Sequence, residues 1–369
     1  MKITMILSRL DQTGMTTHTL DLAEALVRKK HHVTILVGRS SSENSVSKIL
    51  VDKCISTGAN IDWFPIPDRH STISLLHSTI KLIFKIIKLR GVIHVQSPYL
   101  SWIPYILRKK FVSTFHVNDL IKCFYYKNAT HLIAISKETK EYAKCKFGYK
   151  DDEISIINHG VSMEFSKRLT SKQITETRQA LNLPVDKIII TLVGSIERRK
   201  GQDILLKAIE KLPQVTQDKL HIVFLGSDKT ATQENEKWIE KVINDTRLRN
   251  KVTRFEYQDS KIFYQIGDIF LLPSWLEGFG LVVIEAMLAG NLCIRTDTEG
   301  ASEQIEDGKS GFIFPKGDIE KLRDILAEVL ENDSLRNQIA KNGRDFALEH
   351  FTSDVMAEKT LLVYKKIFK

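Results

Sequence analysis

The chain has 369 residues, about two domains' worth, and 43% of them are hydrophobic, which is enough for ordinary buried cores. No apolar run reaches the roughly 18 residues of a membrane span, and residues 1–8 contain too short an apolar stretch for a signal peptide. The four cysteines are scattered without metal-binding spacing and fit a reducing compartment, so we expect a cytoplasmic protein.

The net charge of +9 is unevenly distributed along the chain. Residues 1–160 contain 23 Lys and Arg against 13 Asp and Glu, whereas the remainder is nearly balanced. A basic half suits an anionic lipid surface or another anionic partner. Nucleic acid is not favoured, because no motif interleaves aromatic and basic residues.

Strand and helix patterns alternate through residues 1–161, which predicts a parallel α/β domain. A strand at 3–7 precedes a polar loop, a helix that starts after Gly14, and a strand at 32–38. Gly14 can admit a phosphate or an acceptor group at the helix N-terminus, although a plain turn is an equal alternative. Further elements are predicted at residues 91–99 (a strand with its loop), 111–116, 131–136, 137–147 (a helix) and 154–161.

Residues 71–90 predict an amphipathic helix in which Ile, Leu and Phe interleave with Lys81, Lys85, Lys88 and Arg90. A basic apolar helix can lie on a membrane. It can equally cover a sheet, with its lysines reaching outward to water. We favour the covering helix, because a βαβ unit needs one here.

His116 ends the apolar run at 111–116, at the strand edge where open α/β sheets bind ligands. A hydrogen-bonded histidine without a role is the equal alternative on position alone. After it, residues 162–186 are polar and predict a linker and the start of a second domain, 162–352. Residues 353–369 predict a C-terminal helix.

In the second half, a buried strand at 188–194 leads through Gly194 into a loop and a helix that starts near residue 203. Arg198, Arg199 and Lys200 stand at the start of that helix, where its dipole disfavours cations. An anion between these side chains and the helix amides resolves the conflict. Arg199 and Lys200 are therefore candidate diphosphate ligands, with solvated loop cations as the alternative.

A second strand–loop–helix follows at residues 269–290, with Gly278 and Gly280 in the loop. Glycines allow close backbone approach, and the first amides of the helix, at Leu281 and Val282, suit a phosphate. Glu277 and Glu285 suit hydroxyl groups on either side of such a phosphate, which together describe a sugar nucleotide. A solvated loop glutamate and a glutamate that merely complements the helix dipole are the alternatives.

The acid pair Glu277 and Glu285, with Gly-Phe-Gly after the first glutamate, resembles that of retaining GT-B glycosyltransferases of family 4 (glycosyl transferases group 1). The stretch from Gly194 to Lys200 resembles the same family. The resemblance implies an α/β fold of two Rossmann-like doubly wound domains facing a cleft. Residues 1–161 and the C-terminal helix would bind the acceptor, and residues 162–352 would bind the donor.

The resemblance also implies a role for each candidate residue. Glu285 would bind the nucleotide ribose, Glu277 the donor sugar, Lys200 the diphosphate, and His116 the sugar and β-phosphate region. Tyr257, at the end of the predicted strand 252–257, would lie beside the base. The full donor set is Gly14, Gly194, Arg199, Lys200, Tyr257, Glu277, Gly278, Phe279, Gly280, Leu281, Val282 and Glu285, and the catalytic set is His116, Arg199, Lys200 and Glu277.

The chain departs from the family pattern at two glycine loops. Thr13 replaces the first of two glycines before the first helix, and Ser195 stands where many members carry arginine. Either Arg198 or Arg199 would then supply the missing charge. We expect no metal or other cofactor, because no aspartate cluster has metal spacing and the cations would neutralise the diphosphate.

We therefore expect a glycosyltransferase that moves a sugar from a nucleoside diphosphate, with UDP favoured, to a sugar or lipid-linked acceptor. Cell-surface polysaccharide or glycoconjugate assembly is the expected setting, and docking on the inner face of the membrane is a second hypothesis. Two alternatives remain open. One is a GT-B sugar-nucleotide epimerase, and the other is a non-catalytic sugar-nucleotide-binding partner subunit.

Overall fold

The computed structural model describes residues 1–11, 13–39, 45–66, 72–228, 230 and 232–369. The chain forms two compact units. Unit 1 comprises Met1–Val161 and Thr352–Lys369, and unit 2 comprises Ser162–Phe351. The sequence placed the second boundary one residue later. Thr352 belongs to unit 1, where it forms a bridge with Val161.

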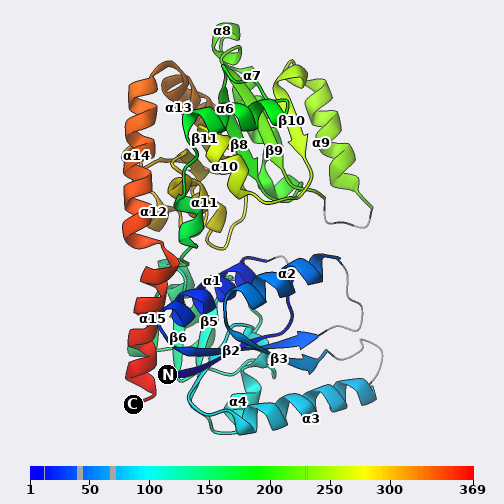
Figure 1. Ribbon diagram of the computed structural model, residues 1–369, viewed down its shortest axis with the longest axis vertical. Coiled ribbons are helices and arrows are strands. Elements are labelled where there is room, and N and C mark those ends of the chain that lie inside the picture. Colours follow the sequence, from blue (N-terminus) through cyan, green and yellow to red (C-terminus); the bar gives the residue numbers. More distant parts are fainter. Residues whose placement is uncertain (12, 40–44, 67–71, 229, 231) are drawn as a thin grey trace. The chain divides into compact units, whose positions relative to one another are not determined.

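Unit 1 contains a seven-stranded parallel sheet in the order β3-β2-β1-β4-β5-β6-β7 (Figure 1). Its strands are β1 (Lys2–Leu7), β2 (His32–Arg39), β3 (Asn60–Pro65), β4 (Val92–Val95), β5 (Val112–Phe115), β6 (His131–Ala134) and β7 (Ile154–Ile156). Its α-helices are α1 (Gly14–Arg28), α2 (Ser45–Ser56), α3 (Thr72–Lys88), α4 (Trp102–Ile106), α5 (Lys137–Phe147) and α15 (Ser353–Ile367). Short 3₁₀ turns lie at η1 (Pro98–Leu100) and η2 (Asp151–Glu153).

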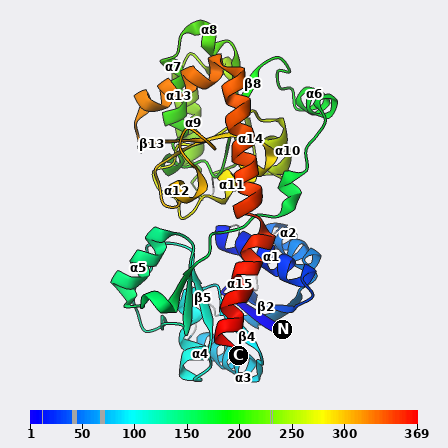
Figure 2. The same ribbon diagram turned by 90° about the vertical axis from the view of Figure 1, so that its left-hand side faces the viewer.

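Both faces of the unit 1 sheet are covered. Alternate strand residues, such as Met5 and Ile35, pack under α1 and α15, and the opposite set, such as Ile6 and Leu36, packs under α3 and α4. Because both faces are buried, the inner strands are largely apolar. Figure 2 shows α15 lying along unit 1 beside α1. The C-terminal helix thus completes the core of the unit in which the chain begins.

Unit 2 contains a six-stranded parallel sheet in the order β10-β9-β8-β11-β12-β13. Its strands are β8 (Ile188–Val193), β9 (Leu220–Leu225), β10 (Val252–Phe255), β11 (Ile269–Leu272), β12 (Leu292–Thr296) and β13 (Phe312–Phe314). Its α-helices are α6 (Ser171–Ala180), α7 (Gln202–Glu210), α8 (Gln214–Gln217), α9 (Glu234–Asp245), α10 (Lys261–Ile266), α11 (Leu281–Ala289), α12 (Ala301–Gln304), α13 (Ile319–Glu331) and α14 (Asp333–His350). The 3₁₀ turns are η3 (Met163–Ser166), η4 (Arg198–Lys200) and η5 (Arg249–Lys251).

The predicted fold class is confirmed, since each unit is a parallel sheet covered by helices. The sequence missed β3 and β13, which lie at the edges of their sheets. It also placed a linker where α6 forms. That helix starts with a capping box, in which Thr170 and Gln173 exchange hydrogen bonds, a local signal that needs no apolar pattern.

Helix α3 covers the sheet, but it does so with only one side. Leu82 and Ile86 are buried against the strands. On the opposite side Leu76, Ile80 and Phe84 are between 42% and 62% exposed. The expected covering role is therefore present, and a second apolar stripe faces outward. Among the residues that the structure describes, no helix combines the length and hydropathy needed to cross a bilayer.

Candidate active site

The strand order of unit 2 fixes where a ligand can bind. From β8 the chain proceeds outward through β9 and β10, and it then returns to β11 on the other side of β8. The loops that follow β8 and β11 therefore diverge at neighbouring carboxyl ends. In open parallel sheets this switch point is the ligand crevice. The two stretches that the sequence singled out, residues 194–201 and 273–280, are these two loops.

Two glycines let the loop after β8 fold back on the loop after β11. Gly201 has φ +71°, and a Cβ there would lie 2.2 Å from the carbonyl oxygen of Pro273. Gly194 has φ +156°, and a Cβ there would lie 3.6 Å from Cε of Lys200. The amide of Trp275 donates to the carbonyl of Arg199 at 2.8 Å. These contacts position Lys200 at the switch point.

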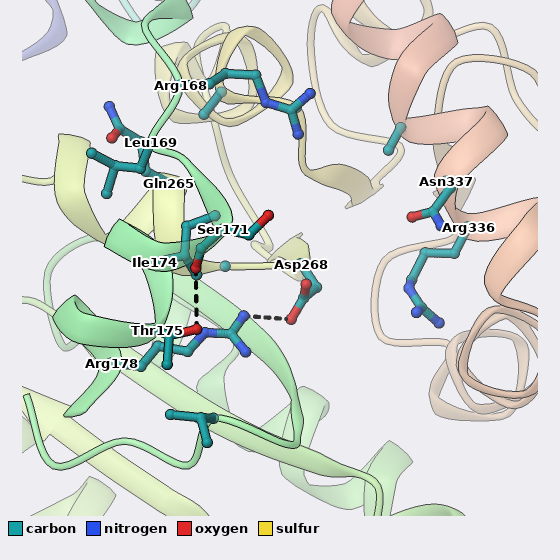
Figure 3. Close-up of a pocket in the computed structure, with 15 residues that line it drawn as sticks. Arg168, Leu169, Ser171, Ile174, Thr175, Arg178, Gln265, Asp268, Arg336 and Asn337 are labelled. Carbon is teal, nitrogen blue, oxygen red and sulfur yellow. Dashed lines mark hydrogen bonds and ion pairs between the residues drawn. The ribbon is translucent and has the colours of Figure 1, made fainter.

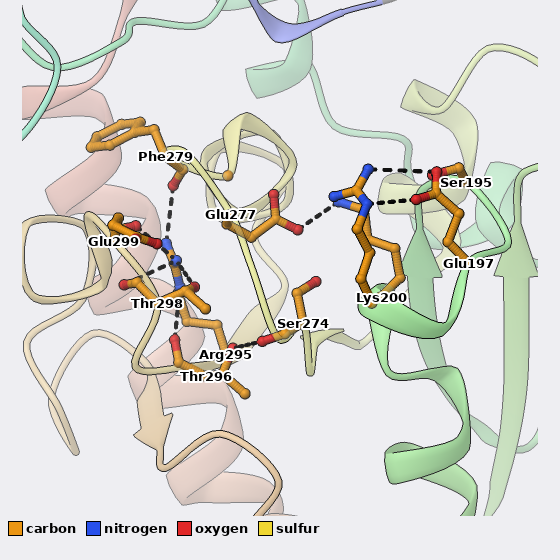
Figure 4. Close-up of polar contacts among 12 residues, drawn as sticks. Ser195, Glu197, Lys200, Ser274, Glu277, Phe279, Arg295, Thr296, Thr298 and Glu299 are labelled. Carbon is orange, nitrogen blue, oxygen red and sulfur yellow. Dashed lines mark hydrogen bonds and ion pairs between the residues drawn. The ribbon is translucent and has the colours of Figure 1, made fainter. Parts of the chain in front are cut away.

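Lys200 and Glu277 form the central ion pair of this crevice (Figure 4). The Lys200 Nζ lies 2.5 Å from the Glu277 Oε1, and the two side chains are only 12% and 10% exposed. A pair so poorly solvated is costly to hold without further partners. The ammonium has three donors, so Lys200 can bind an anion while it keeps Glu277.

The remaining loop cations are held differently. The Arg199 Nε donates to Glu197 Oε2 at 2.5 Å, and the Ser195 hydroxyl donates to the same carboxylate. Burial alone would raise the pKa of Glu197, but the hydrogen bonds from Ser195 and Arg199 outweigh it and lower that pKa. Arg198 lies over the ring of Trp238 at 5.1 Å. Of the two arginines proposed to replace the family residue at Ser195, Arg199 is the one joined to Ser195 through a shared carboxylate.

Helix α11 presents its N-terminus to the crevice. Gly280 is its N-cap, with φ +81°, and within the described parts of the chain no side chain caps this end. The first amides, at Leu281 and Val282, belong to the group that an α-helix leaves without internal partners. Gly278 precedes them in the loop. A helix start of this kind suits a phosphate oxygen.

A buried arginine fixes the shape of the loop after β11. Arg295, in the middle of β12, is fully buried and donates to the carbonyl of Phe279 at 3.0 Å and to Thr298 Oγ1 at 2.6 Å (Figure 4). It also contacts the Gln304 amide oxygen, and the Gln304 amide group donates to the Phe279 carbonyl at 2.7 Å. The side chain of Phe279 is buried, so this residue would contact a bound sugar nucleotide through its main chain.

Glu285 lies one turn into α11 and is buried. Its Oε2 accepts a hydrogen bond from the hydroxyl of Tyr264 at 2.8 Å. Burial, and then the charge of Glu285, raise the pKa of Tyr264 well above its usual value, so the phenol remains a donor. Tyr257, two residues after β10, is largely exposed, and partial burial, followed by the charge of Glu285, raises its pKa. The acid and the aromatic ring predicted for ribose and base thus both belong to unit 2.

A hollow of about 320 Å³ lies elsewhere in unit 2, between α6, α14 and the start of β11 (Figure 3). Arg178 is tied down there, because it donates to the carbonyl of Ile266 and pairs with Asp268 at 2.9 Å. Asp268 precedes β11 and Lys187 precedes β8, so this hollow is at the amino-terminal edge of the sheet. It is not the crevice at the carboxyl ends.

In unit 1, His116 follows β5 and both of its ring nitrogens have partners. Nε2 lies 3.0 Å from the Gln96 Oε1, and Nδ1 lies 3.2 Å from the His159 Nε2. Gln96 follows β4, and His159 follows β7. The ring of His18, on α1, lies 4.9 Å from that of His116 and 4.4 Å from that of His159. His116 is thus one member of a histidine cluster and not an isolated side chain.

Gly14 begins α1, and Thr13 is its N-cap, accepting from the amide of Thr16 at 3.4 Å. Threonine is a favoured N-cap residue. The threonine at position 13, where the family usually has glycine, therefore has a structural reason in this chain. Its hydroxyl oxygen accepts a hydrogen bond from one of the amides that the helix leaves without an internal partner.

Comparison with known proteins identifies the family. Residues 12–165 match the model described as "Glycosyltransferase Family 4", and residues 173–346 match "Glycosyl transferases group 1". The chain belongs to glycosyltransferase family 4.

Named relatives of this glycosyltransferase point the same way. It is 24% identical to an uncharacterized glycosyltransferase of Methanocaldococcus jannaschii over 95% of this chain and 94% of that protein. It is 28% identical to the capsular polysaccharide biosynthesis glycosyltransferase CapM of Staphylococcus aureus, over 65% of this chain and 63% of that protein. It is 25% identical to the D-inositol 3-phosphate glycosyltransferase of Corynebacterium diphtheriae, over 64% of this chain and 56% of that protein.

Solved structures agree on the fold. Anabaena Alr3699/HepE in complex with UDP has a TM-score of 0.83 at 18% identity, with 99% of this chain and all of that one covered. A glycosyltransferase from Rickettsia africae has a TM-score of 0.84 at 23% identity, with 100% and 98% covered. The glycosyltransferase therefore has the GT-B fold of two Rossmann-like domains.

The sequence singled out both loops at the switch point of unit 2, but it missed several residues that hold the candidate side chains of the two units in place. Arg295 and Tyr264 in unit 2, and Gln96, His18 and His159 in unit 1, were not predicted. Arg295 left one signal, a charge in the middle of an apolar strand, which requires buried partners. The other four are ordinary residues in ordinary elements, and only the fold brings them to their sites.

Proposed function

We propose that this glycosyltransferase moves a sugar from a UDP-sugar to an acceptor hydroxyl with retention of anomeric configuration, in cell-surface polysaccharide or glycoconjugate assembly. The observation that carries the donor site is the Lys200–Glu277 pair at the switch point of unit 2, beside the N-terminus of α11. Alr3699/HepE, which has the same fold, binds UDP and UDP-glucose. CapM acts in capsular polysaccharide biosynthesis. These similarities support the nucleotide and the setting.

The chemistry proposed for Lys200 is electrostatic. Negative charge grows on the leaving diphosphate as the glycosidic bond breaks, and Lys200, Arg199 and the amides of Leu281 and Val282 would stabilise it. Such a group accelerates the reaction only by binding the transition state better than the ground state. No enzymic nucleophile is proposed. The acceptor attacks from the face that the diphosphate leaves, and a donor phosphate oxygen takes the acceptor proton.

The two glutamates are proposed to hold the donor at either end. Glu277 would accept hydrogen bonds from the donor sugar, while its other partner, Lys200, binds the diphosphate. Glu285, oriented by Tyr264, would accept from the ribose hydroxyls, with Tyr257 beside the base. A hydrogen bond to a charged group contributes about 1.5–3 kcal/mol. His116 is proposed to act from the other unit, at the carboxyl end of β5.

A panel of nucleotide sugars tests this proposal, with release of the nucleoside diphosphate as the readout and a membrane extract as the acceptor source. We expect UDP release that depends on the extract, with the α-anomeric centre of the donor preserved in the product. Conversion of the donor without extract would instead indicate an epimerase. Binding of UDP-sugar without turnover, restored by a second protein fraction, would indicate a non-catalytic partner subunit.

We propose further that unit 1 docks on the cytoplasmic face of an anionic membrane, to reach a lipid-linked acceptor. The outward stripe of α3 carries this proposal. Its residues Leu76, Ile80, Phe84 and Ile87 recur at helical spacing and are all exposed. Lys81 and Lys88 flank the stripe, are exposed, and would face lipid headgroups. Lys85 is excluded from this role, because it pairs with Asp62 at 2.5 Å.

Vesicle flotation at low salt tests the docking. We expect the chain to float with vesicles containing phosphatidylserine and to sediment with neutral ones, and Ile80→Gln with Phe84→Gln to abolish flotation. Leu362→Gln is the matched control, since Leu362 is an exposed leucine on α15 of the same unit. Equal flotation of the double variant, or no dependence on anionic lipid, would contradict docking through α3.

A further inference from the structure

The hollow in unit 2 between α6, α14 and the start of β11 presents an excess of positive charge (Figure 3). Its volume is about 320 Å³, and the charged residues that line it are Arg168, Arg178, Arg336 and Asp268. Three cations against one anion leave the lining with a formal charge of +2. A concave surface lined by one sign of charge concentrates ions of the opposite sign. This hollow therefore attracts anions, at the edge of the sheet opposite the proposed donor crevice.

Asp268 is committed to one of these arginines. It pairs with Arg178 at 2.9 Å and accepts a hydrogen bond from the amide of Ile189 at 2.7 Å. Arg178 is 7% exposed and also donates to two backbone carbonyl oxygens. The aspartate and this arginine thus neutralise each other within a fixed part of the wall. The positive charge that the hollow offers to a ligand comes from the other two arginines.

Arg168, unlike Arg178, has no polar partner. Among the residues that the structure describes, its guanidinium takes part in no hydrogen bond and no ion pair. The group nevertheless packs against the chain, since a Cβ added at Gly290 would lie 3.3 Å from the Arg168 Cζ. A guanidinium carries five N–H donors in a planar fork. Because Arg168 is exposed, a soluble ligand can reach these donors.

A fourth arginine, Arg344 on α14, lies near Arg168. It donates to the carbonyl oxygens of Ser166 and Leu288. Burial first, and then the charge of Arg168, lower the pKa of the Arg344 guanidinium, with Asp345 opposing them. The two cations are therefore close enough to repel each other, and Arg344 uses its donors on the backbone. An anion bound to Arg168 would relieve this repulsion.

The rest of the lining suits an oxyanion and hydroxyl groups. Arg336 pairs with Asp333 at 2.8 Å and donates to the carbonyl of Val329, which leaves further donors of its fork free. Asn337 follows it on α14, and Ser171, the first residue of α6, lines the other side of the hollow (Figure 3). The dipole at the start of a helix adds to the attraction for an anion.

We propose that this hollow binds a soluble phosphorylated small molecule, with its phosphate on Arg168 and its polar remainder toward Arg336 and Asn337. A phosphate monoester carries a charge of about −1.5 to −2 near pH 7, which complements the lining. The arginine fork matches two phosphate oxygens. Ligand pockets span about 300–1,000 Å³, and a hollow at the small end of that range suits a sugar phosphate better than a sugar nucleotide. The site does not depend on the proposed donor or reaction.

Titration calorimetry tests the proposal on the full-length chain carrying Lys200→Ala, in which the donor crevice lacks its central cation. Inorganic phosphate is the general probe, glucose 6-phosphate the larger one, and glucose the uncharged control. We expect both phosphates to bind and glucose not to bind. Failure of both phosphates to bind, or equal binding of glucose, would overturn the proposal.

Arginine variants in the same background locate the binding. Arg168→Gln should weaken it about 10-fold or more, as expected for the loss of hydrogen bonds to a charged group, and Arg336→Gln should weaken it less. Arg323→Gln is the matched control, because Arg323 on α13 of the same unit pairs with Asp324 at the surface and does not line the hollow. Equal affinity in Arg168→Gln and Arg323→Gln would overturn the proposal.

Arg168→Lys separates a phosphate ligand from a structural cation. The structural alternative is that Arg168 complements the dipole at the C-terminal end of α11, where Gly290 lies. Lysine preserves that role, but it cannot form the two parallel hydrogen bonds of the arginine fork. Arg168→Lys should therefore unfold at the wild-type temperature and bind phosphate more weakly. A loss of thermal stability in Arg168→Gln, with phosphate binding unchanged, would assign Arg168 to the helix end and overturn the site.

Crystals of the wild-type chain soaked in tungstate, a heavy tetrahedral analogue of phosphate, locate the anion without any variant. The anomalous peak should lie in the hollow, within hydrogen-bond distance of the Arg168 guanidinium. A peak only beside Lys200 in the donor crevice, or only at lysines elsewhere on the surface, would overturn the proposal.

Discussion

The two units use the same sheet design for opposite kinds of chemistry. In unit 2 the carboxyl ends of β8 and β11 meet a charged pair, Lys200 and Glu277, beside a helix N-terminus. In unit 1 the corresponding edge carries three neutral imidazoles and the amide of Gln96. One edge is suited to stabilising charge that develops on a phosphate. The other is suited to lone-pair donation.

The two edges are held in place by different kinds of contact. The pair in unit 2 is held by backbone contacts between its loops and by the buried guanidinium of Arg295. The imidazoles in unit 1 are held by side chains on neighbouring strands, where Gln96 lies between His94 and His116. Substitutions at the first edge should therefore act on turnover and donor binding. Substitutions at the second should act on the acid stability of unit 1.

The largest effect should come from breaking the charged edge. Lys200→Ala should lower kcat by about 100- to 1000-fold, because it removes a charge that stabilises the leaving group, while the donor KM changes much less. Steady-state kinetics measure both. Lys207→Ala is the control, since Lys207 on α7 pairs with Asp203 outside the crevice. Equal losses in kcat and donor affinity would show that Lys200 only binds the ground state.

Next in size is the donor affinity that Glu285 supplies. Glu285→Gln should weaken binding of the nucleoside diphosphate about 10- to 100-fold, the equivalent of 1.5–3 kcal/mol for hydrogen bonds to a charged group. Tyr264→Phe keeps the carboxylate and should weaken binding less. Titration calorimetry with UDP measures both variants. Unchanged affinity in Glu285→Gln would remove this residue from the ribose site.

Arg295 tests whether the loop after β11 depends on its buried cation. Arg295→Met leaves the carbonyl of Phe279 and the side chain of Thr298 with fewer donors, so unit 2 should lose about 2–4 kcal/mol of unfolding free energy. Urea unfolding measures this loss. Arg323→Met on α13, whose cation pairs with Asp324 at the surface, is the matched control and should change the unfolding free energy much less. Similar losses in the two variants would contradict the role of Arg295.

The smallest effects concern acid stability, where each unit has a strand histidine bonded to a hydroxyl on the next strand. His131 lies 2.9 Å from Ser155, and His221 lies 2.8 Å from Thr253. Burial, helped by Lys366 and opposed by Glu153 and Asp152, lowers the pKa of His131 from 6.5 to about 4. The unfolded chain then takes up the proton first, so unit 1 should become less stable as the pH falls from 6.5 towards 4 and should lose no stability above 6.5.

His221 should show the same direction with a smaller effect, because it is partly exposed; burial and then Lys251 lower its pKa. Hydrogen exchange of peptides from each unit, corrected for the intrinsic pH dependence of exchange, follows both units at pH 7.5 and pH 5. His131→Asn should flatten the response of unit 1 only. A response of unit 1 that is identical with and without His131 would contradict this account.

Much of the fold was predictable from local patterns. Fully buried parallel strands are apolar along their whole length, so β1, β8 and β11 could be read directly. The glycines at 194, 201 and 280 have backbone angles that other residues adopt only with strain, and their positions predicted both loops of the crevice. The edge strands β3 and β13 were missed because their apolar signal is weak: β3 contains the polar Asn60 and Asp62, and β13 has only three residues.

For the candidate site, the sequence was informative wherever one segment carried the whole signal. Arg199 and Lys200 stand at an unfavourable end of a helix, and Glu277 and Glu285 flank a glycine loop. The apolar residues of the outward stripe of α3 were also visible in the sequence. From the sequence alone, however, they could not be separated from the apolar residues that cover the sheet. Only the structure shows that Leu82 and Ile86 are buried and that the stripe is not.

By itself the sequence determined most of the strands and helices, the two loops at the switch point of unit 2 and the family, because each depends on residues close together in the chain. Only the tertiary structure decided which distant side chains meet. Lys200 reaches Glu277 across 77 positions, and His18 reaches His159 across a whole unit. Parallel strands bring their carboxyl ends to one edge in an order set by topology and not by distance along the chain. Burial of both faces of the sheet is what stabilises this strand order.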